Sequence, residues 1–106
     1  MIKGIVLKLH ERSLKGITRR VVAACDEDAL GKVHKSGQIV LDLKTYRDFY
    51  EGEKVSEKEL QEKLQGADNV NLVGKKTITA ASVVLPLSLK DARRIGGVPH
   101  IQFYRV

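Results

Sequence analysis

The sequence predicts a single α+β domain, in which a mixed or antiparallel sheet carries an N-terminal β-hairpin and about two helices. Three observations lead to this prediction. Short segments of alternating or β-branched apolar residues recur along the chain, as strands require. One segment has complete start and stop signals for a helix. The 106 residues contain no repeat, linker or low-complexity segment, so we expect one domain, residues 1–106, with one core.

The first two strands are predicted to form the N-terminal hairpin. Apolar residues alternate through Ile2–His10, which indicates a half-buried strand. Glu11–Gly16 is polar and contains Ser and Gly, so we expect a turn there. The β-branched segment Ile17–Cys25 is the expected second strand. Asp26 then has the character of an N-cap, and we expect one helical turn that ends at Gly31.

The clearest helix is predicted at Glu57–Gln65. Ser56 and Glu59 form the S-x-x-E pattern of a capping box, and Gly66 is a typical stop. Residues 51–66 also carry more acidic than basic side chains. We therefore expect this helix to point away from any anionic partner.

Further strands are predicted at Gln38–Leu43 and Asn69–Val73, and a final strand, VPHIQFYRV, follows Gly96-Gly97 within Ile95–Val106. Thr77–Leu85 is ambiguous, because its β-branched residues favour a strand while its apolar spacing fits a helical face. The pattern Ser88-x-x-Asp91 predicts a short capped turn. The aromatic segment before the acidic helix has no regular pattern.

The charge distribution favours a polyanionic partner. The formal net charge is +6, and the positive excess lies before residue 51 and after residue 66. Nucleic acid is the commonest partner of such a surface, although a solvated lysine-rich surface is the alternative. No segment has the length of a membrane span or the pattern of a signal peptide, so we expect a cytoplasmic protein without membrane contact.

The single cysteine, Cys25, excludes an internal disulfide framework and a cysteine-rich zinc site. The histidines, His10, His34 and His100, lack the i, i+3 or i, i+4 spacing of a helical ligand pair. Strands can gather distant ligands, but we expect no metal and no cofactor.

The stretch NLVGKKTITA raises the question of a phosphate-binding loop. A Walker-type loop, G-x-x-x-x-G-K-[ST], would need glycine at Asn69 and a hydroxyl at Lys76. Both positions fail, so nucleotide hydrolysis is not expected. Two interpretations stay open: a turn before a buried element, or a cluster of N–H groups and positive charge at Gly74–Thr77 that binds a phosphate.

Four segments resemble the archaeal family of domain of unknown function 424. They are ACDEDALGKV (Ala24–Val33), DFYEGEKVS (Asp48–Ser56), NLVGKK (Asn71–Lys76) and RIGGVPHIQ (Arg94–Gln102). The resemblance covers nearly the whole chain and implies a small α+β cytoplasmic protein with a helix at Thr77–Leu85. It implies no established activity or catalytic residue, and only a loose association with translation. Leu14–Arg20 departs from it by being longer and more basic than the family suggests.

The leading hypothesis is a non-enzymatic protein that binds structured RNA or a ribonucleoprotein through a basic surface. Its expected phosphate contacts are Arg19, Arg20, Lys75, Lys76, Arg93 and Arg94, with His100 and Asn71 nearby. Aromatic residues make up only 5 % of the chain, and tryptophan is absent. We therefore expect contact with the RNA backbone rather than base-specific recognition.

Two alternatives remain open. An enzyme of unknown type would need Cys25 or Asp26 within hydrogen-bond reach of His100 in a cleft. Its candidate pocket contains Cys25, Asp26, Asn71, Gly74, Gly96, Gly97 and His100. Simpler interpretations are an inert buried cysteine and a β-bulge at the two glycines. The other alternative is a protein-interaction module, monomeric or homodimeric, that pairs through an edge strand.

Overall fold

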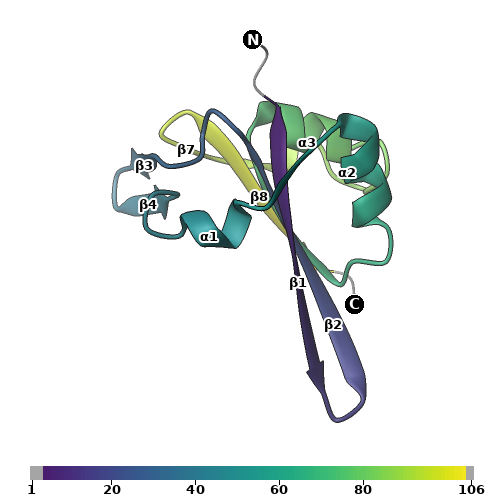
Figure 1. The fold of residues 1–106 in the computed structure, drawn as a ribbon. Coiled ribbons are helices and arrows are strands. Elements are labelled where there is room, and N and C mark those ends of the chain that lie inside the picture. Colours follow the sequence, from purple (N-terminus) through teal and green to yellow (C-terminus); the bar gives the residue numbers. More distant parts are fainter. Residues whose placement is uncertain (1–3, 105–106) are drawn as a thin grey trace.

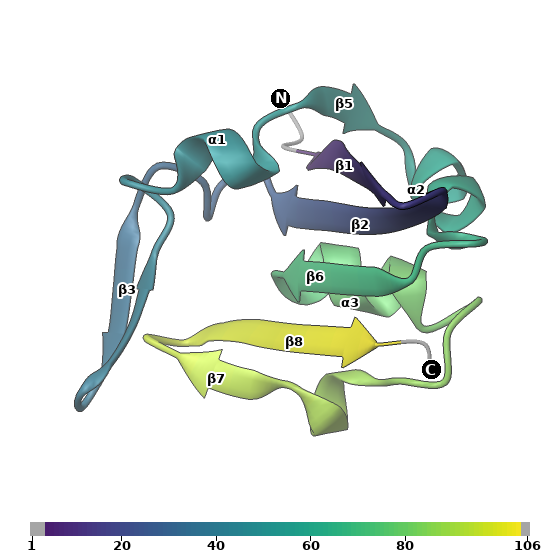
Figure 2. The same ribbon diagram turned by 90° about the horizontal axis from the view of Figure 1, so that it is seen from below.

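The computed structural model describes residues 4–104, which build a six-stranded mixed sheet and a separate small hairpin (Figures 1 and 2). The strand order is β5-β1-β2-β6-β8-β7, and only the β2–β6 pair is parallel. The strands are β1 (Ile5–Leu14), β2 (Ile17–Asp26), β3 (Val33–Ser36), β4 (Ile39–Asp42), β5 (Glu53–Val55), β6 (Asn69–Val73), β7 (Arg93–Ile95) and β8 (Val98–Tyr104). The helices are α1 (Arg47–Tyr50), α2 (Glu57–Leu64), α3 (Lys75–Ala81) and the 3₁₀ helix η1 (Leu89–Asp91). The predicted α+β class with an N-terminal hairpin is confirmed.

Helices α2 and α3 cover one face of the sheet and form the main core. Leu60 and Leu64 lie one turn apart on α2 and are both buried, as is Ile78 of α3. They pack against Val22 and Leu72 from the central strands. In Figure 2 both helices lie behind the strands. We call this side of the sheet the helix face.

The opposite side, which we call the open face, is covered only in part. A smaller core lies there under α1 and the segment after β4, and it contains Val6, Ala23, Cys25, Leu43 and Tyr50. The β3–β4 hairpin stands at the end of the sheet where β8 begins (Figure 2). Beyond this smaller core, the described helices leave the strands of the open face uncovered.

The β1–β2 hairpin is longer than the sequence predicts. The expected turn at Glu11–Gly16 is wrong, because Glu11–Leu14 continues β1 and pairs with β2. The reversal takes only Lys15 and Gly16, whose φ angles of 53° and 79° fit a two-residue hairpin turn. All residues from 11 to 20 are exposed, and this part of the hairpin projects from the body (Figure 1). We call residues 11–20 the arm.

The expected helical turn after Asp26 is also wrong. Residues 27–31 form turns, in which the Ala29 N–H donates to the Asp26 carbonyl at 3.0 Å. The Asp26 side chain caps a different helix instead: its carboxylate accepts from the Lys76 and Thr77 N–H groups at the start of α3. The residue type fits a cap in either place, and the parallel pairing of β2 with β6 decides which helix it reaches.

Local signals elsewhere are confirmed. Ser56 and Glu59 form the predicted capping box of α2, and Ser88 with Asp91 forms one at η1. The ambiguous segment Thr77–Leu85 begins as helix α3, as the family resemblance implies. The short elements β3, α1, β5 and β7 are not predicted, because three or four residues carry too little periodicity.

Candidate functional site

The strand register brings a row of polar side chains onto the open face. Residues that are direct partners across neighbouring strands share a face, because side chains alternate along each strand. Arg12 pairs with Arg19, Asn71 with Gln102, and His100 with Arg93. Polar side chains on this face are Lys8, His10, Arg12, Arg19, Lys54, Asn69, Asn71, Arg93, His100, Gln102 and Tyr104.

The charge on these open-face strand positions is entirely positive. Five of them are lysine or arginine and none is acidic: Lys8, Lys54, Arg12, Arg19 and Arg93. Lys8 donates to the Asp48 carbonyl at 2.7 Å, and Lys54 pairs with Glu27 at 3.0 Å. The three arginines are exposed and form no ion pair with any residue between 4 and 104.

Two neighbouring cross-strand pairs on the arm show how the faces differ. On the helix face, Glu11 lies opposite Arg20, and the two form an ion pair with 3.8 Å between Nε and Oε1. On the open face, Arg12 lies directly opposite Arg19. Like charges in this position destabilise a β-ribbon. An anion between the two guanidinium groups would remove that repulsion, so the arginine pair is a candidate site for a negative ligand.

The predicted phosphate contacts do not form one surface. Arg19, Arg93 and His100 lie on the open face, while Arg20 and Arg94 lie on the helix face. Adjacent residues of a strand point in opposite directions, so the pairs Arg19-Arg20 and Arg93-Arg94 are each divided between the faces. Lys75 and Lys76 are exposed in the first turn of α3, away from the arm.

The backbone N–H groups at the start of α3, in the segment Gly74–Thr77, are already bound by a side chain of the protein itself. The Asp26 carboxylate accepts from the Thr77 N–H at 2.8 Å, the Thr77 hydroxyl at 2.7 Å and the Lys76 N–H at 3.2 Å. Gly74 is required beside it, because its φ is 103° and a Cβ there would lie 2.2 Å from the Asp26 Cγ. The Asp26 carboxylate thus occupies the position that a phosphate would need. The interpretation of Gly74–Thr77 as a phosphate-binding cluster of N–H groups is therefore wrong.

Cys25 is an inert core residue. Its side chain is fully buried, and its thiol donates to the Asp26 carbonyl at 3.1 Å. Burial, reinforced by the negative charges of Asp26 and Asp28, raises the pKa of the Cys25 thiol to about 12. Strand β6 lies between Cys25 on β2 and His100 on β8, which separates their backbones by about 10 Å. The fold therefore supplies no Cys25–His100 pair.

Gly96 and Gly97 form the turn between β7 and β8. Their φ angles are 58° and 81°, as in a two-residue hairpin turn, so the expected β-bulge is wrong. Gly96 also packs against β3: its N–H donates to the Ser36 hydroxyl at 2.9 Å, and a Cβ would lie 2.9 Å from the Lys35 nitrogen. Gly96 is therefore the glycine of this turn that contacts the small hairpin, whereas a Cβ on Gly97 would meet nothing within 4 Å.

Asn71 and His100 are brought together in one pocket of the open face. The pocket has a volume of about 550 Å³ and lies between the sheet, α1 and β4. It is lined by Val40, Leu41, Asp42, Leu43, Tyr46, Phe49, Tyr50, Asn71 and His100. Of the predicted pocket residues, Cys25, Asp26, Gly74, Gly96 and Gly97 do not line it.

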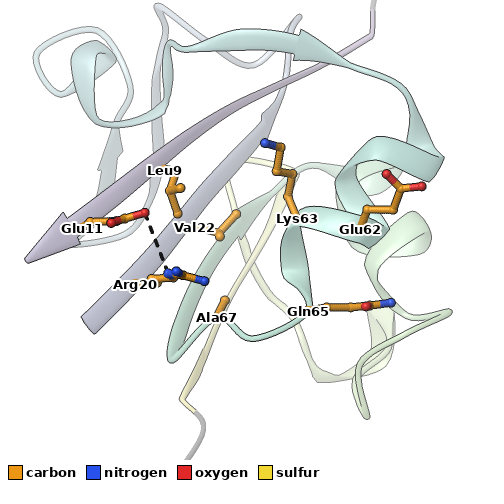
Figure 3. A pocket seen from close by; sticks show the side chains of 8 residues that line it. All are labelled: Leu9, Glu11, Arg20, Val22, Glu62, Lys63, Gln65 and Ala67. Carbon is orange, nitrogen blue, oxygen red and sulfur yellow. Dashed lines mark ion pairs between the residues drawn. The ribbon is translucent and has the colours of Figure 1, made fainter. Parts of the chain in front are cut away.

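A second hollow lies on the helix face, between the arm and α2 (Figure 3). It has a volume of about 290 Å³ and is lined by Leu9, Glu11, Arg20, Val22, Glu62, Lys63, Gln65 and Ala67. Its two acidic and two basic side chains balance, and Glu11 already pairs with Arg20. This hollow therefore offers no net positive charge to an anionic ligand.

Residues 4–104 contain no group of three or more His, Cys, Asp or Glu side chains arranged to hold a metal ion. Within the same part of the chain, no helix has the length and apolar character needed to cross a bilayer.

The contacts expected from the sequence did not include Arg12, Gln102, Tyr46 or Phe49. One signal was available for the sheet residues. Polar side chains alternate in Asn69-x-Asn71 and in His100-x-Gln102-x-Tyr104, within strands whose other residues are mostly apolar. A period of two in polar residues marks a face that is not packed against the core. For Tyr46 and Phe49 no such signal exists.

Comparisons with known proteins give a family and a fold. Residues 17–106 match the model of a family described as "Protein of unknown function (DUF424)". The fold is similar to the crystal structure of an uncharacterized conserved protein from Methanopyrus kandleri, with a TM-score of 0.74 and 25 % sequence identity. That similarity covers 94 % of this chain and 90 % of the other. No curated protein matches the chain.

Proposed function

We propose that this chain, which belongs to the family of proteins of unknown function DUF424, binds structured RNA, free or within a ribonucleoprotein. The contact surface is the open face together with the arm. The observation that carries the proposal is the Arg12–Arg19 pair: two exposed arginines directly opposite each other, with no acidic residue on the strand positions of that face. The arrangement costs stability unless an anion binds between them.

The charge distribution supports a polyanion rather than a single phosphate. Arg93 lies at the other edge of the same face, so the positive charges extend across the sheet from the arm to β7. Helix α2, whose residues Glu57, Glu59 and Glu62 are acidic, covers the opposite face. The open-face strand positions, which carry no acidic residue, therefore attract a long anion more strongly than α2 does, because the three glutamates of α2 outnumber its two lysines.

The polar side chains between the arginines suit an RNA backbone. Asn71 and Gln102 offer amide donors and acceptors for phosphate oxygens and 2′-hydroxyl groups. Tyr104 is exposed beside them, and the Gln102 amide donates to its hydroxyl. The arm, which projects from the body, can enter a groove or a junction that a flat surface cannot reach.

Matched pairs of arginines provide the test. Titration of a fluorescently labelled RNA hairpin by anisotropy, at several KCl concentrations, gives the slope of log K against log salt. We expect the double variant Arg12→Gln/Arg19→Gln to lower the slope by about 1 per lost phosphate contact and to weaken binding. The control, Arg20→Gln/Arg94→Gln, removes the same charge from the helix face of β2 and β7 and should leave the slope nearly unchanged.

Equal losses in the two double variants would show that only net charge matters and would refute the assignment to the open face. Binding that does not depend on salt would refute the proposal as a whole. Because the family resemblance carries an association with translation, ribosomal particles are the first natural RNA source to test. Co-sedimentation with them at low salt, and release at high salt, is the expected result.

A further inference from the structure

The 550 Å³ pocket of the open face has the composition of a site for a flat, partly polar ligand. Apolar side chains from β4 and the ring of Phe49 form much of its lining, and Tyr46, whose side chain is 65 % exposed, stands at its rim. The volume lies in the range of small-molecule sites, about 300–1,000 Å³, and a mostly apolar pocket with a few polar groups is typical of them.

Two polar side chains in the pocket have no partner among the described residues. Neither the Asn71 amide nor the His100 ring forms a hydrogen bond within residues 4–104, although both are half-buried. Asp42 differs, because its Oδ1 already accepts from the Lys44 and Thr45 N–H groups at 3.1 and 2.8 Å. The amide of Asn71 presents a donor and an acceptor side by side, which matches the edge of a nucleobase.

Positive charge lies next to this pocket. Arg93 is the cross-strand partner of His100, and burial together with the Arg93 charge lowers the pKa of the His100 ring. A neighbouring hollow of about 370 Å³ shares His100 with the pocket, and its other lining residues are Asp91, Arg93, Ile101 and Gln102. The Asp91 carboxylate already accepts from the Ser88 N–H at 2.9 Å, which leaves Arg93 as the basic side chain of this hollow. A ligand that places a ring in the first hollow therefore has an arginine available for an attached phosphate.

We infer that the pocket binds the base of a nucleotide whose phosphate contacts Arg93. Asn71 hydrogen-bonds the edge of the base, and Tyr46 with Phe49 provides aromatic contact. This inference rests on the proposed function and deepens it, since the natural source is a nucleotide bulged out of a structured RNA, although a free mononucleotide has the same chemistry. Unstacked bases in loops and bulges are what proteins recognise in RNA.

The first experiment compares two RNA hairpins that differ only in one bulged nucleotide. We expect the bulged hairpin to bind about tenfold more tightly, with each of the four bases tried in turn. Asn71→Ala should abolish this preference. Asn69→Ala is the matched control, because Asn69 lies two residues away on the same strand and face but does not line the pocket. This variant should keep the preference for the bulged hairpin, whatever its effect on the affinity for both hairpins. Tyr46→Ala, at an exposed position, is a second test if Asn71→Ala fails to fold.

The second experiment adds AMP, GMP, CMP and UMP to ¹⁵N-labelled protein and follows the Asn71 side-chain amide by NMR. Shifts at Asn71 with a mononucleotide, without any preference for the bulged hairpin, would assign the pocket to a free nucleotide. If neither RNA nor mononucleotides move the Asn71 signal, the inference is overturned. In that case, equal binding of both hairpins, with an affinity that depends on salt and on the open-face arginines, would still support the proposed function. Failure of both hairpins to bind would refute the proposed function as well.

Discussion

Replacing Arg12 by glutamate is predicted to stabilise the arm while weakening RNA binding. Arg12 lies opposite Arg19 on an exposed ribbon. Two unit charges about 6 Å apart in water interact with about 0.7 kcal/mol, and salt near physiological strength screens part of this. Arg12→Glu exchanges a repulsion for an attraction of similar size. The expected gain is therefore about 0.5–1 kcal/mol at low salt, within the range for exposed pairs.

Hydrogen exchange is the suitable assay for this gain. The arm contributes no residue to the buried core, so it can open without global unfolding, and a urea midpoint would not detect its local stability. A gain of 0.5–1 kcal/mol slows exchange of the arm amides about two- to fivefold. In 1 M salt the difference between variant and parent should largely disappear, because the Debye length falls to about 3 Å.

Arg12→Glu should change arm stability and RNA binding in opposite directions. Arg12→Glu lowers the net charge of the proposed RNA-binding face by two and should therefore reduce the salt slope of binding by more than Arg12→Gln does. Arm amides that exchange as fast as in the parent would show that the two guanidinium groups avoid each other without cost. An unchanged affinity for RNA would show that the arginine pair is not the binding site.

Three further predictions concern the rest of the site. Asp26→Ala should lower the free energy of unfolding by about 3–5 kcal/mol, because three hydrogen bonds to its carboxylate are lost. The exposed control Asp28→Ala should lower it by less than about 0.5 kcal/mol. Urea unfolding followed by circular dichroism measures both values. Cys25, with its pKa near 12, should resist iodoacetamide at pH 8 until urea unfolds the protein; rapid alkylation of the native chain would contradict its burial. The His100 pKa lies below its usual 6.5, so its contribution to stability is present at neutral pH and is lost as the pH falls from about 6.5 through the folded-state value. Arg93→Gln should raise that pKa in an NMR titration, and an unchanged value would exclude the Arg93 charge as a cause.

Elements with signals inside a few neighbouring residues could be predicted from the sequence. The capping box of Ser56 and Glu59 contains both of its partners within one turn, so it identifies α2 without tertiary information. The segment Ile17–Cys25 is β-branched and apolar over most of its length, and it forms β2. The arm strand Glu11–Leu14 lacks these signals, because its pairing depends on cross-strand contacts and a two-residue turn.

Asp26 shows why the candidate site was harder to predict than the fold. Its position after a strand and before Glu27 and Asp28 is the pattern of a local N-cap, and nothing in that pattern excludes the interpretation. The true partners, Lys76 and Thr77, come from a helix about fifty residues further along the chain. Only the parallel pairing of β2 with β6 brings them together, and a sequence pattern does not determine that pairing.

The function of the basic residues depends on strand register in the same way. Net charge and its distribution along the chain correctly indicate a basic protein, but they treat Arg19 and Arg20 as equivalent. In the fold, Arg20 faces Glu11 and is neutralised, while Arg19 faces Arg12 and is not. A shift of register by one residue would exchange these roles and remove the uncompensated pair. Positive charge that the fold leaves uncompensated, rather than positive charge as such, is therefore the property on which the proposed RNA-binding role of the arm depends.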